Sequence, residues 1–236
     1  MIDKRCSSAR EAVAPVHDGA TVMIGGFGSA GSPVELIHAL IDQGARGLTV
    51  ISNNAGCGRV GLAALIEAGR VERVVCSFPR SADSEAFAAR YRAGRIALDL
   101  VPQGTLAERI RAGGAGIPAF YTPVSVGTPL GEGKERRSVG GRECVLEHAL
   151  TADFALVKAE RADRYGNLVY RKTARNFGPI MCMASRVAIV QARRIVEPGE
   201  IDPEVVVTPG VFVQRVVEVR DPADESALVR EGRRYP

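Results

Sequence analysis

The sequence predicts an α/β protein built on an open, mainly parallel, doubly wound sheet, with added hairpins and edge strands in its C-terminal part. Short apolar runs alternate with amphipathic helical patterns through the first two-thirds of the chain, as in consecutive β-α units. Val, Ile and Ala are abundant while Trp is absent, a composition typical of helices that cover a buried parallel sheet. Glycines follow most of the helical patterns, where helices commonly end.

Strands and helices are expected to alternate before residue 120. The strands are residues 21–24, 48–52, 71–76 and 96–101, and the helices are residues 34–42, 61–68, a helix ending near 93 and one beginning near 105. Ser32 is a candidate N-cap for the first helix, with Pro33 at the first helical position and Glu35 completing a capping box. Asp83 is expected to cap the third helix. Pro102 ends the fourth strand, because proline has no N–H to donate to a sheet ladder.

After residue 121 the pattern changes to hairpins and single strands. Gly140 and Gly141 form a hairpin signal, and Gly166 lies in a second one between residues 154–158 and 168–171. Further strands are expected at residues 187–191, 205–208 and 211–219. We interpret residues 1–220 as a single domain and residues 221–236 as a polar C-terminal tail that is mobile or contacts a partner.

Composition and charge argue against several classes of function. The 236-residue chain has a net charge of +4, and its basic residues are scattered rather than interleaved with aromatics, so nucleic acid is not an expected partner. Apolar runs stay shorter than the roughly 20 residues of a membrane-spanning helix, and the N-terminal residues do not resemble a signal peptide. The cysteines include no C-x-x-C pair, which argues against a metal site or a disulfide framework. We expect a cytoplasmic protein with reduced thiols.

A glycine-rich loop follows the first predicted strand. Residues 26–31 match G-x-G-x-x-G between a strand and a helix, where backbone N–H groups can approach a phosphate. A dinucleotide site also needs an acidic residue at the end of the second strand, and Asn53 and Asn54 stand there instead. An NAD-dependent oxidoreductase therefore stays an alternative. A glycine turn that only packs the helix on the strand is another.

Polar side chains follow the next three predicted strands. Asn53 and Asn54 come after the second strand, Arg80 after the third and Gln103 after the fourth. Because the carboxyl ends of parallel strands share one edge of the sheet, we expect these side chains to converge. Amides both donate and accept, which suits a carboxylate beside a keto oxygen, and an arginine can bind a second carboxylate bidentately. The plainer interpretation is that these are turn residues and a solvated loop arginine.

Common catalytic patterns are missing from the chain. His17, His38 and His148 lack a partner at the spacing of a catalytic triad or a metal site. Phe27 stands where the G-x-S-x-G nucleophile motif requires a glycine. We therefore expect no catalytic residue of its own in this chain.

Several ordered motifs resemble the first-subunit segment of the family I coenzyme A transferases, over nearly the whole chain. They are residues 24–28 (IGGFG), 52–56 (SNNAG), 101–120, 153–159 (DFALVKA) and 171–177 (RKTARNF). The resemblance implies transfer of CoA between a thioester and a 3-oxo acid. It assigns CoA binding to the glycine loop, residues Ile24, Gly25, Gly26, Phe27, Gly28, Ser29 and Ala30. It assigns substrate contacts to Asn53, Asn54, Phe78, Arg80 and Gln103.

The resemblance also explains the missing nucleophile. In the family, a glutamate in a Ser-Glu-Asn-Gly motif of the second subunit, or second half, attacks the thioester. Here the nearest string, Ser84-Glu85-Ala86, lacks Asn-Gly, so Glu85 is rejected as the nucleophile. We expect a second subunit that carries this glutamate, in an α2β2 assembly, with CoA as a substrate thioester and no permanently bound cofactor.

Two segments bear on the acceptor. The Ser-Phe-Pro-Arg form of residues 77–80, and residues 208–215, resemble family members that act on 3-oxoadipate with succinyl-CoA as the donor. The alternatives are an acetoacetate-type transferase, a dinucleotide-dependent oxidoreductase and a non-catalytic CoA-binding regulator. A partner chain carrying Ser-Glu-Asn-Gly would separate the transferase from the last two.

Overall fold

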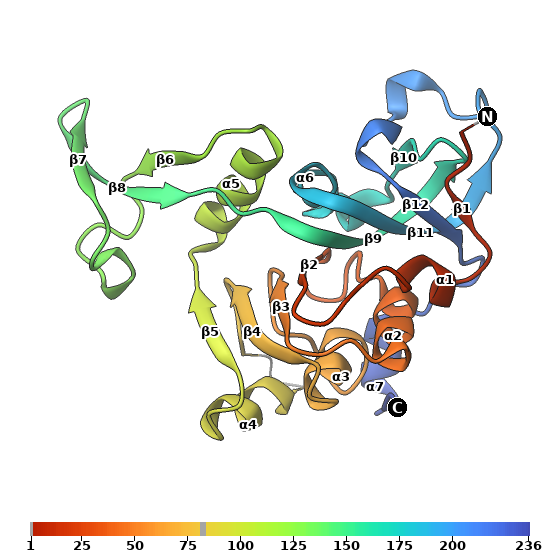
Figure 1. Ribbon diagram of the computed structural model, residues 1–236, viewed down its shortest axis with the longest axis horizontal. Helices are drawn as coiled ribbons and strands as arrows, with labels where there is room; N and C mark the ends of the chain where they lie inside the picture. Colours follow the sequence, from red (N-terminus) through yellow and green to blue (C-terminus); the bar gives the residue numbers. More distant parts are fainter. Residues whose placement is uncertain (1, 81–83) are drawn as a thin grey trace.

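In the part of the chain that the structure describes, a sheet of nine strands runs through the molecule and confirms the predicted α/β class (Figure 1). The computed structural model describes residues 2–80 and 84–236. Among these residues, neighbouring strands of the sheet run parallel except for β10, which pairs antiparallel with β9. In spatial order the strands are β1 (Arg5–Cys6), β12 (Arg215–Glu218), β11 (Ser185–Val196), β9 (Ala152–Asp163), β2 (Thr21–Ile24), β3 (Leu48–Ile51), β4 (Val71–Cys76) and β5 (Ala97–Leu100), with β10 (Leu168–Val169) beside β9.

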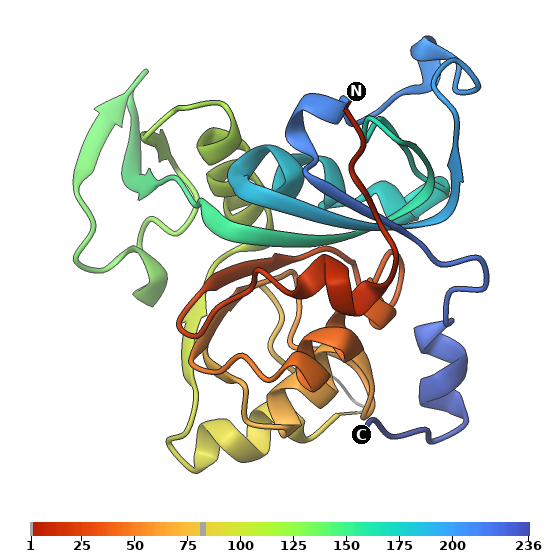
Figure 2. The same ribbon diagram turned by 45° about the vertical axis from the view of Figure 1, so that its right-hand side comes forward.

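Helices cover both faces of this sheet (Figure 2). Along β2, Val22 and Ile24 pack in one core with α2 and α3, whereas Met23 packs in the opposite core with α5 and α6. This alternation has the two-residue period of a strand that is buried on both faces. The helices are α1 (Ala9–Val13), α2 (Val34–Gln43), α3 (Gly61–Glu67), α4 (Ala86–Arg92), α5 (Gln103–Gly114), α6 (Gly178–Ala184) and α7 (Glu225–Arg230). Within the described ranges, none is long and apolar enough to cross a membrane.

The order of the strands creates a switch point beside β2. The chain passes from β2 to β3, β4 and β5 in one direction, then returns to β9 on the other side of β2 and continues to β11 and β12. Open α/β sheets bind ligands at such a reversal, outside the carboxyl ends of the strands. The loops that follow β2, β3, β4 and β5 all leave from this edge, because these strands are parallel.

A second, three-stranded antiparallel sheet projects from the body of the molecule (Figure 1). Its strands, in the order β6 (Ala119–Thr122), β8 (Arg142–His148) and β7 (Arg136–Val139), follow α5. The predicted Gly140-Gly141 hairpin joins β7 to β8, and both glycines have the positive φ, 57° and 76°, that a tight hairpin turn requires. The second predicted hairpin, at Gly166, joins β9 to β10.

Two predicted strands near the C terminus are wrong in whole or in part. Val205 ends a 3₁₀ turn, residues 206–208 contribute only an isolated bridge between Thr208 and Leu168, and the start of 211–219 lies in another 3₁₀ turn before β12. Pro203 and Pro209 supply the reason, because each lacks the N–H that a strand would donate and has the φ that begins a turn. The 3₁₀ segments are η1 (Pro129–Gly131), η2 (Lys172–Arg175), η3 (Pro203–Val205) and η4 (Gly210–Phe212).

The predicted capping box at α2 is also wrong. The N-cap is Pro33, and among the described residues no side chain caps the helix. Ser32 lies beside the carboxyl group of Glu225 in the same small cavity, and Glu35 accepts from the backbone N–H of Ala223 at 2.5 Å. Both side chains therefore bind the C-terminal segment, which local sequence pattern does not reveal. Asp83, the expected cap of the third helix, lies outside the described residues.

The C-terminal segment packs against the domain rather than extending from it as a mobile tail (Figure 2). Lys158 of β9 donates to the Ala223 carbonyl at 3.3 Å, and Asp224 caps the start of α7. The Tyr235 ring stacks on the imidazole of His38, with centroids 3.7 Å apart, and its hydroxyl donates to Asp42 at 2.7 Å. Residues 223–235 are thus held at both ends of α7.

Glu225, the first residue of α7, carries a buried carboxyl group. Its side chain is only 4% exposed, and this burial raises its pKa from an ordinary 4.5 to about 7. The Ser32 hydroxyl and the positive charge of Lys158 favour the ionised form, while the neighbouring Asp224 disfavours it. Burial dominates, so the folded protein holds this proton more tightly than the unfolded chain does.

We predict that Glu225 makes the protein less stable as pH rises from about 4.5 to about 7. Below that range the carboxyl is protonated in both states, within it the unfolded chain releases a proton that the folded protein still holds, and above it both states are ionised. Glu225→Gln should remove this effect, so the variant should gain on the order of 2–3 kcal/mol over the wild type between those pH values. Denaturant unfolding across this range measures the difference. Glu231→Gln, at an exposed position of the same segment, is the control, and identical pH curves for Glu225→Gln and wild type would contradict the prediction.

Candidate active site

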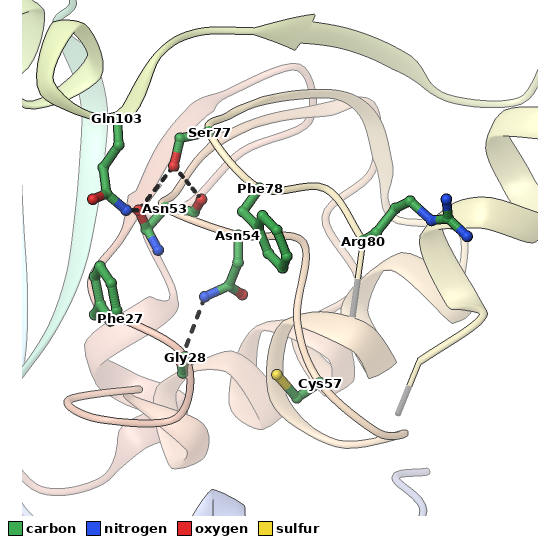
Figure 3. A pocket seen from close by; sticks show the side chains of 9 residues that line it. All are labelled: Phe27, Gly28, Asn53, Asn54, Cys57, Ser77, Phe78, Arg80 and Gln103. Carbon is green, nitrogen blue, oxygen red and sulfur yellow. Dashed lines mark hydrogen bonds between the residues drawn. The ribbon is translucent and has the colours of Figure 1, made fainter. Parts of the chain in front are cut away.

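An open cavity of about 520 Å³ lies at the carboxyl ends of β2, β3, β4 and β5 (Figure 3). It brings together, from three loops and the first residue of α5, most of the side chains that the sequence predicted for the site. The lining residues are Phe27, Gly28, Asn53, Asn54, Cys57, Ser77, Phe78, Arg80 and Gln103. Phe27 and Gly28 of the glycine loop, both asparagines and Gln103 thus meet at the switch point of the sheet, and Arg80 lies at the rim.

Asn53 is the most firmly held polar side chain in the cavity. It is only 4% exposed, and its Oδ1 accepts from Gln103 Nε2 at 2.8 Å and from Ser77 Oγ at 2.9 Å. These two bonds fix the orientation of the amide, and Figure 3 shows Nδ2 turned toward the space between Phe27 and Asn54. Among the described residues, Nδ2 has no acceptor. The site therefore presents a fixed N–H donor that can meet a carbonyl or carboxylate oxygen.

Asn54 has a different role from Asn53. Its Oδ1 accepts from the backbone N–H of Gly56 at 2.8 Å, as a turn residue does, and its Nδ2 reaches the Gly28 carbonyl at 3.5 Å. The side chain thus connects the loop after β3 with the glycine loop after β2 (Figure 3). Its amide shapes the cavity and is already engaged by the protein.

The glycine loop forms a tight hairpin with its tip at the cavity. Phe27 and Ala30 exchange backbone hydrogen bonds of 3.0 and 3.1 Å across the tip. Gly28 has a φ of +58°, and a Cβ placed on it would meet no described protein atom within 4 Å. Gly31, at the base, has no such space, because a Cβ there would lie 2.6 Å from the Ala174 carbonyl oxygen. The open side of Gly28 therefore faces room for a ligand, while Gly31 allows close packing of η2.

The other residues of the predicted CoA loop do not face this cavity. Ile24, Gly25 and Gly26 are buried and line a small cavity behind the loop. The Ser29 hydroxyl bonds to the hydroxyl of Ser226 in α7. The Ala30 carbonyl accepts from Asn176 Nδ2 at 2.9 Å. Of the seven loop residues, Phe27 and Gly28 are the two that reach the large cavity.

Two exposed aromatic rings and one arginine mark the rim. Phe27 is 51% and Phe78 62% exposed, which is unusual for phenylalanine and suits contact with a ligand or a second chain. Arg80 is exposed, and Figure 3 shows its guanidinium directed away from Asn53 and Gln103. In this conformation Arg80 borders the site without pointing into it.

Sequence reasoning missed two lining residues, Ser77 and Cys57. Ser77 directly follows β4, so the strand-end argument that nominated Arg80 applied to it as well. Cys57 lies three positions beyond Asn54 in the loop after β3, and nothing in its local pattern distinguishes it.

The lining of the cavity contains no carboxylate and no imidazole among the described residues. Glu85 is exposed and pairs with Arg92 elsewhere on the surface, in agreement with its rejection as a nucleophile. His38 is half-buried and stacks on Tyr235, its Nε2 accepts from the Gly61 N–H at 3.0 Å, and desolvation lowers its pKa. In residues 2–80 and 84–236, no group of three His, Cys, Asp or Glu side chains is placed to hold a metal ion.

The sequence of this chain is similar to those of proteins of known family. Residues 6–219 match the family described as Coenzyme A transferase. The chain is 60% identical over 226 residues to a 3-oxoadipate CoA-transferase subunit of Pseudomonas putida, covering 96% of this chain and 98% of that protein. It is 50% identical over 214 residues to a probable succinyl-CoA:3-ketoacid coenzyme A transferase subunit of Bacillus subtilis, covering 91% of this chain and 89% of that protein.

A solved structure shares the fold. An acyl-CoA transferase from E. coli O157:H7, crystallised as a thioester complex with CoA, superposes with a TM-score of 0.82 at 23% identity. The match covers 94% of this chain and 50% of that chain, so this protein spans about half the length of the E. coli enzyme chain. Together with the match over residues 6–219, the similarity to the two bacterial subunits shows that the chain belongs to the coenzyme A transferase family.

Proposed function

We propose that this chain is the first subunit of a two-subunit CoA-transferase that moves CoA from succinyl-CoA to a 3-oxo acid, with 3-oxoadipate as the acceptor. The observation that carries the proposal is the near full-length similarity to 3-oxoadipate CoA-transferase subunits, at 60% and 56% identity. An acetoacetate-type transferase is the second candidate, favoured by relatives named succinyl-CoA:3-ketoacid transferases at 46–50% identity. A dinucleotide-dependent enzyme is disfavoured, because amides occupy the strand end where an acidic residue would bind the ribose.

The reaction requires a nucleophilic carboxylate, and none is present among the described residues that line this cavity. A carboxylate oxygen attacks the thioester carbonyl and displaces CoA thiolate, which then attacks the resulting anhydride to give an enzyme-bound CoA thioester and free succinate. The same two steps in the opposite sense transfer CoA to the 3-oxo acid. No Asp or Glu lines the described part of the cavity, so we assign the carboxylate to a glutamate of the second subunit, in an α2β2 assembly.

The role of this chain is to bind and orient the reactants. The open side of Gly28 leaves room for the CoA thioester to approach the loop backbone. The fixed Nδ2–H of Asn53 can donate to a substrate oxygen and to the negative charge that develops on it, without reorganisation during the reaction. CoA enters this scheme as a substrate and leaves as part of the product.

We predict that the purified chain alone transfers no CoA, because the described lining of its cavity contains no carboxylate that could attack the thioester. Activity should appear when the chain is mixed with a second subunit that carries the glutamate, and disappear again when that glutamate is changed to alanine. Formation of 3-oxoacyl-CoA from succinyl-CoA is the measurement. Turnover by the isolated chain, free of copurifying partner, would overturn the two-subunit proposal.

We predict that Gly28→Ala lowers kcat/KM for succinyl-CoA about tenfold or more in the reconstituted enzyme. A methyl group there would project into the open space at the tip of the loop and would strain a backbone with positive φ. Gly140→Ala is the matched control, since Gly140 has a φ of +57° and equally open surroundings in the distant β7–β8 hairpin. Equal effects of the two substitutions would assign the loss at Gly28 to backbone strain alone.

We predict that Arg80 recognises the second carboxylate of 3-oxoadipate once it turns toward the cavity. A charge-assisted hydrogen bond contributes about 1.5–3 kcal/mol, so Arg80→Ala should lower kcat/KM for 3-oxoadipate roughly ten- to a hundredfold. The loss should be small for acetoacetate, which lacks that carboxylate. Arg92→Ala, at another exposed arginine, should leave both substrates unaffected. Equal losses on both acceptors would show that Arg80 does not set the choice of substrate.

A further inference from the structure

The small cavity behind the glycine loop is closed by a residue from the far end of the chain. Glu225 of α7 lies there among the loop glycines and Ser32. Its carboxylate sits so close to the start of α3 that a Cβ on Gly61 would be 2.6 Å from Glu225 Oε1. The loop thus has the ligand cavity on one side of its tip and a buried carboxyl group behind its base.

Two neighbouring residues of α7 face two points of the loop. Ser32, at the end of the loop, lies beside Glu225, since the Cβ position of Gly61 is 2.6 Å from Glu225 Oε1 and 3.7 Å from Ser32 Oγ, and its hydroxyl favours the ionised carboxylate. The hydroxyl of Ser29, next to the tip, bonds to the hydroxyl of Ser226. The positions of Ser29 and Ser32 both depend on where α7 lies. Because Gly28 lies beside Ser29, its position at the cavity depends on the same contact.

The residue before the N-cap of α7 is held by two other elements, and the first turn of the helix is capped from within. The Ala223 N–H donates to Glu35 of α2, and the Ala223 carbonyl accepts from Lys158 of β9. The Asp224 carboxylate accepts from the N–H groups of Ser226 and Ala227, at 2.9 and 3.3 Å. A segment held in this way can restrain a glycine loop that has few side-chain contacts of its own.

A buried carboxyl group is less favourable at this position than an apolar side chain would be. Burying an ionisable side chain costs free energy, which an apolar side chain of similar size would avoid. Such groups beside a ligand cavity are candidates for a functional role. The lining of the ligand cavity does not include Glu225, so its contribution has to act through the loop.

We propose that Glu225 and Ser226 are positioning residues, which hold the glycine loop in the conformation that receives the CoA thioester. The inference rests on the proposed function, because it takes CoA as the ligand of the loop. Loss of either contact should loosen the loop and weaken binding of the CoA thioester. The 3-oxo acid should be affected little, because Asn53, Gln103 and Ser77 hold one another by hydrogen bonds that do not involve α7.

The test uses the enzyme reconstituted with its second subunit and compares KM with kcat for both substrates. Glu225→Leu should raise KM for succinyl-CoA about tenfold, as expected for loss of a buried hydrogen bond, and change KM for the 3-oxo acid by less than about twofold. Glu225→Gln keeps the size and an oxygen acceptor for Ser32, so it should restore most of the affinity. If Glu225→Leu does not assemble with the second subunit, Ser226→Ala tests the same contact between α7 and the loop, and it should raise KM for succinyl-CoA several-fold. Glu231→Gln is the control in the same segment.

An unchanged KM for succinyl-CoA in both Glu225→Leu and Ser226→Ala would overturn the inference. Equal rises for both substrates, or a fall in kcat and melting temperature alone, would also overturn it, since either result indicates only a structural role.

Hydrogen exchange of the backbone amides gives a second readout that does not require activity. Exchange should accelerate in residues 25–32 of Glu225→Leu but not in β3. If the wild-type complex transfers no CoA, the proposed function fails, and faster exchange confined to the loop would still support the positioning role. Unchanged exchange in the loop would overturn that role in either case.

Discussion

The site depends on the pairing of β2 with β3 on one side and with β9 on the other. The ladder continues past the end of β2, because the Gly25 N–H donates to the Leu156 carbonyl at 3.0 Å. The glycine loop therefore begins from a backbone that the sheet still holds. Buried backbone groups have to be paired, so the starting points of the neighbouring loops cannot shift without breaking the sheet. Parallel pairing alone places three loops and the start of α5 around one cavity.

Within that frame, different side chains orient the ligand and shape the cavity. Asn53 is oriented by Gln103 and Ser77, so its N–H donor is preorganised before any ligand binds. Asn54 connects two loops, and both its Nδ2 and its Oδ1 already form hydrogen bonds within the protein. The exposed rings of Phe27 and Phe78 leave the cavity open at its rim. An open, preorganised half-site whose described lining lacks a carboxylate fits a family member that works with a second subunit.

The C-terminal segment shows how remote parts of a chain can support a loop of small residues. Ser226 meets Ser29 across 197 positions of sequence, and Glu225 lies buried behind the same loop. Glycines allow the backbone to come close to a ligand, but they contribute few side-chain contacts that would hold it in place. The support has to come from elsewhere, and here it comes from α7 on one face and from the segment after η2, through Asn176, on the other.

Hydrophobic periodicity, turn chemistry and ordered motifs were enough to predict the α/β class, the positions of β2 and β4, and the family. The same reasoning nominated Asn53 and Gln103, because the carboxyl ends of parallel strands share an edge. The different roles of Asn53 and Asn54 emerged from the folded molecule, since both amides look alike until their partners are known. Folding also brought Ser32 and Glu35 to the C-terminal segment, in place of the expected capping box. A local sequence pattern cannot reveal a contact with a residue far away in the chain. Ser29 and Ser226, which bond to each other, are 197 positions apart.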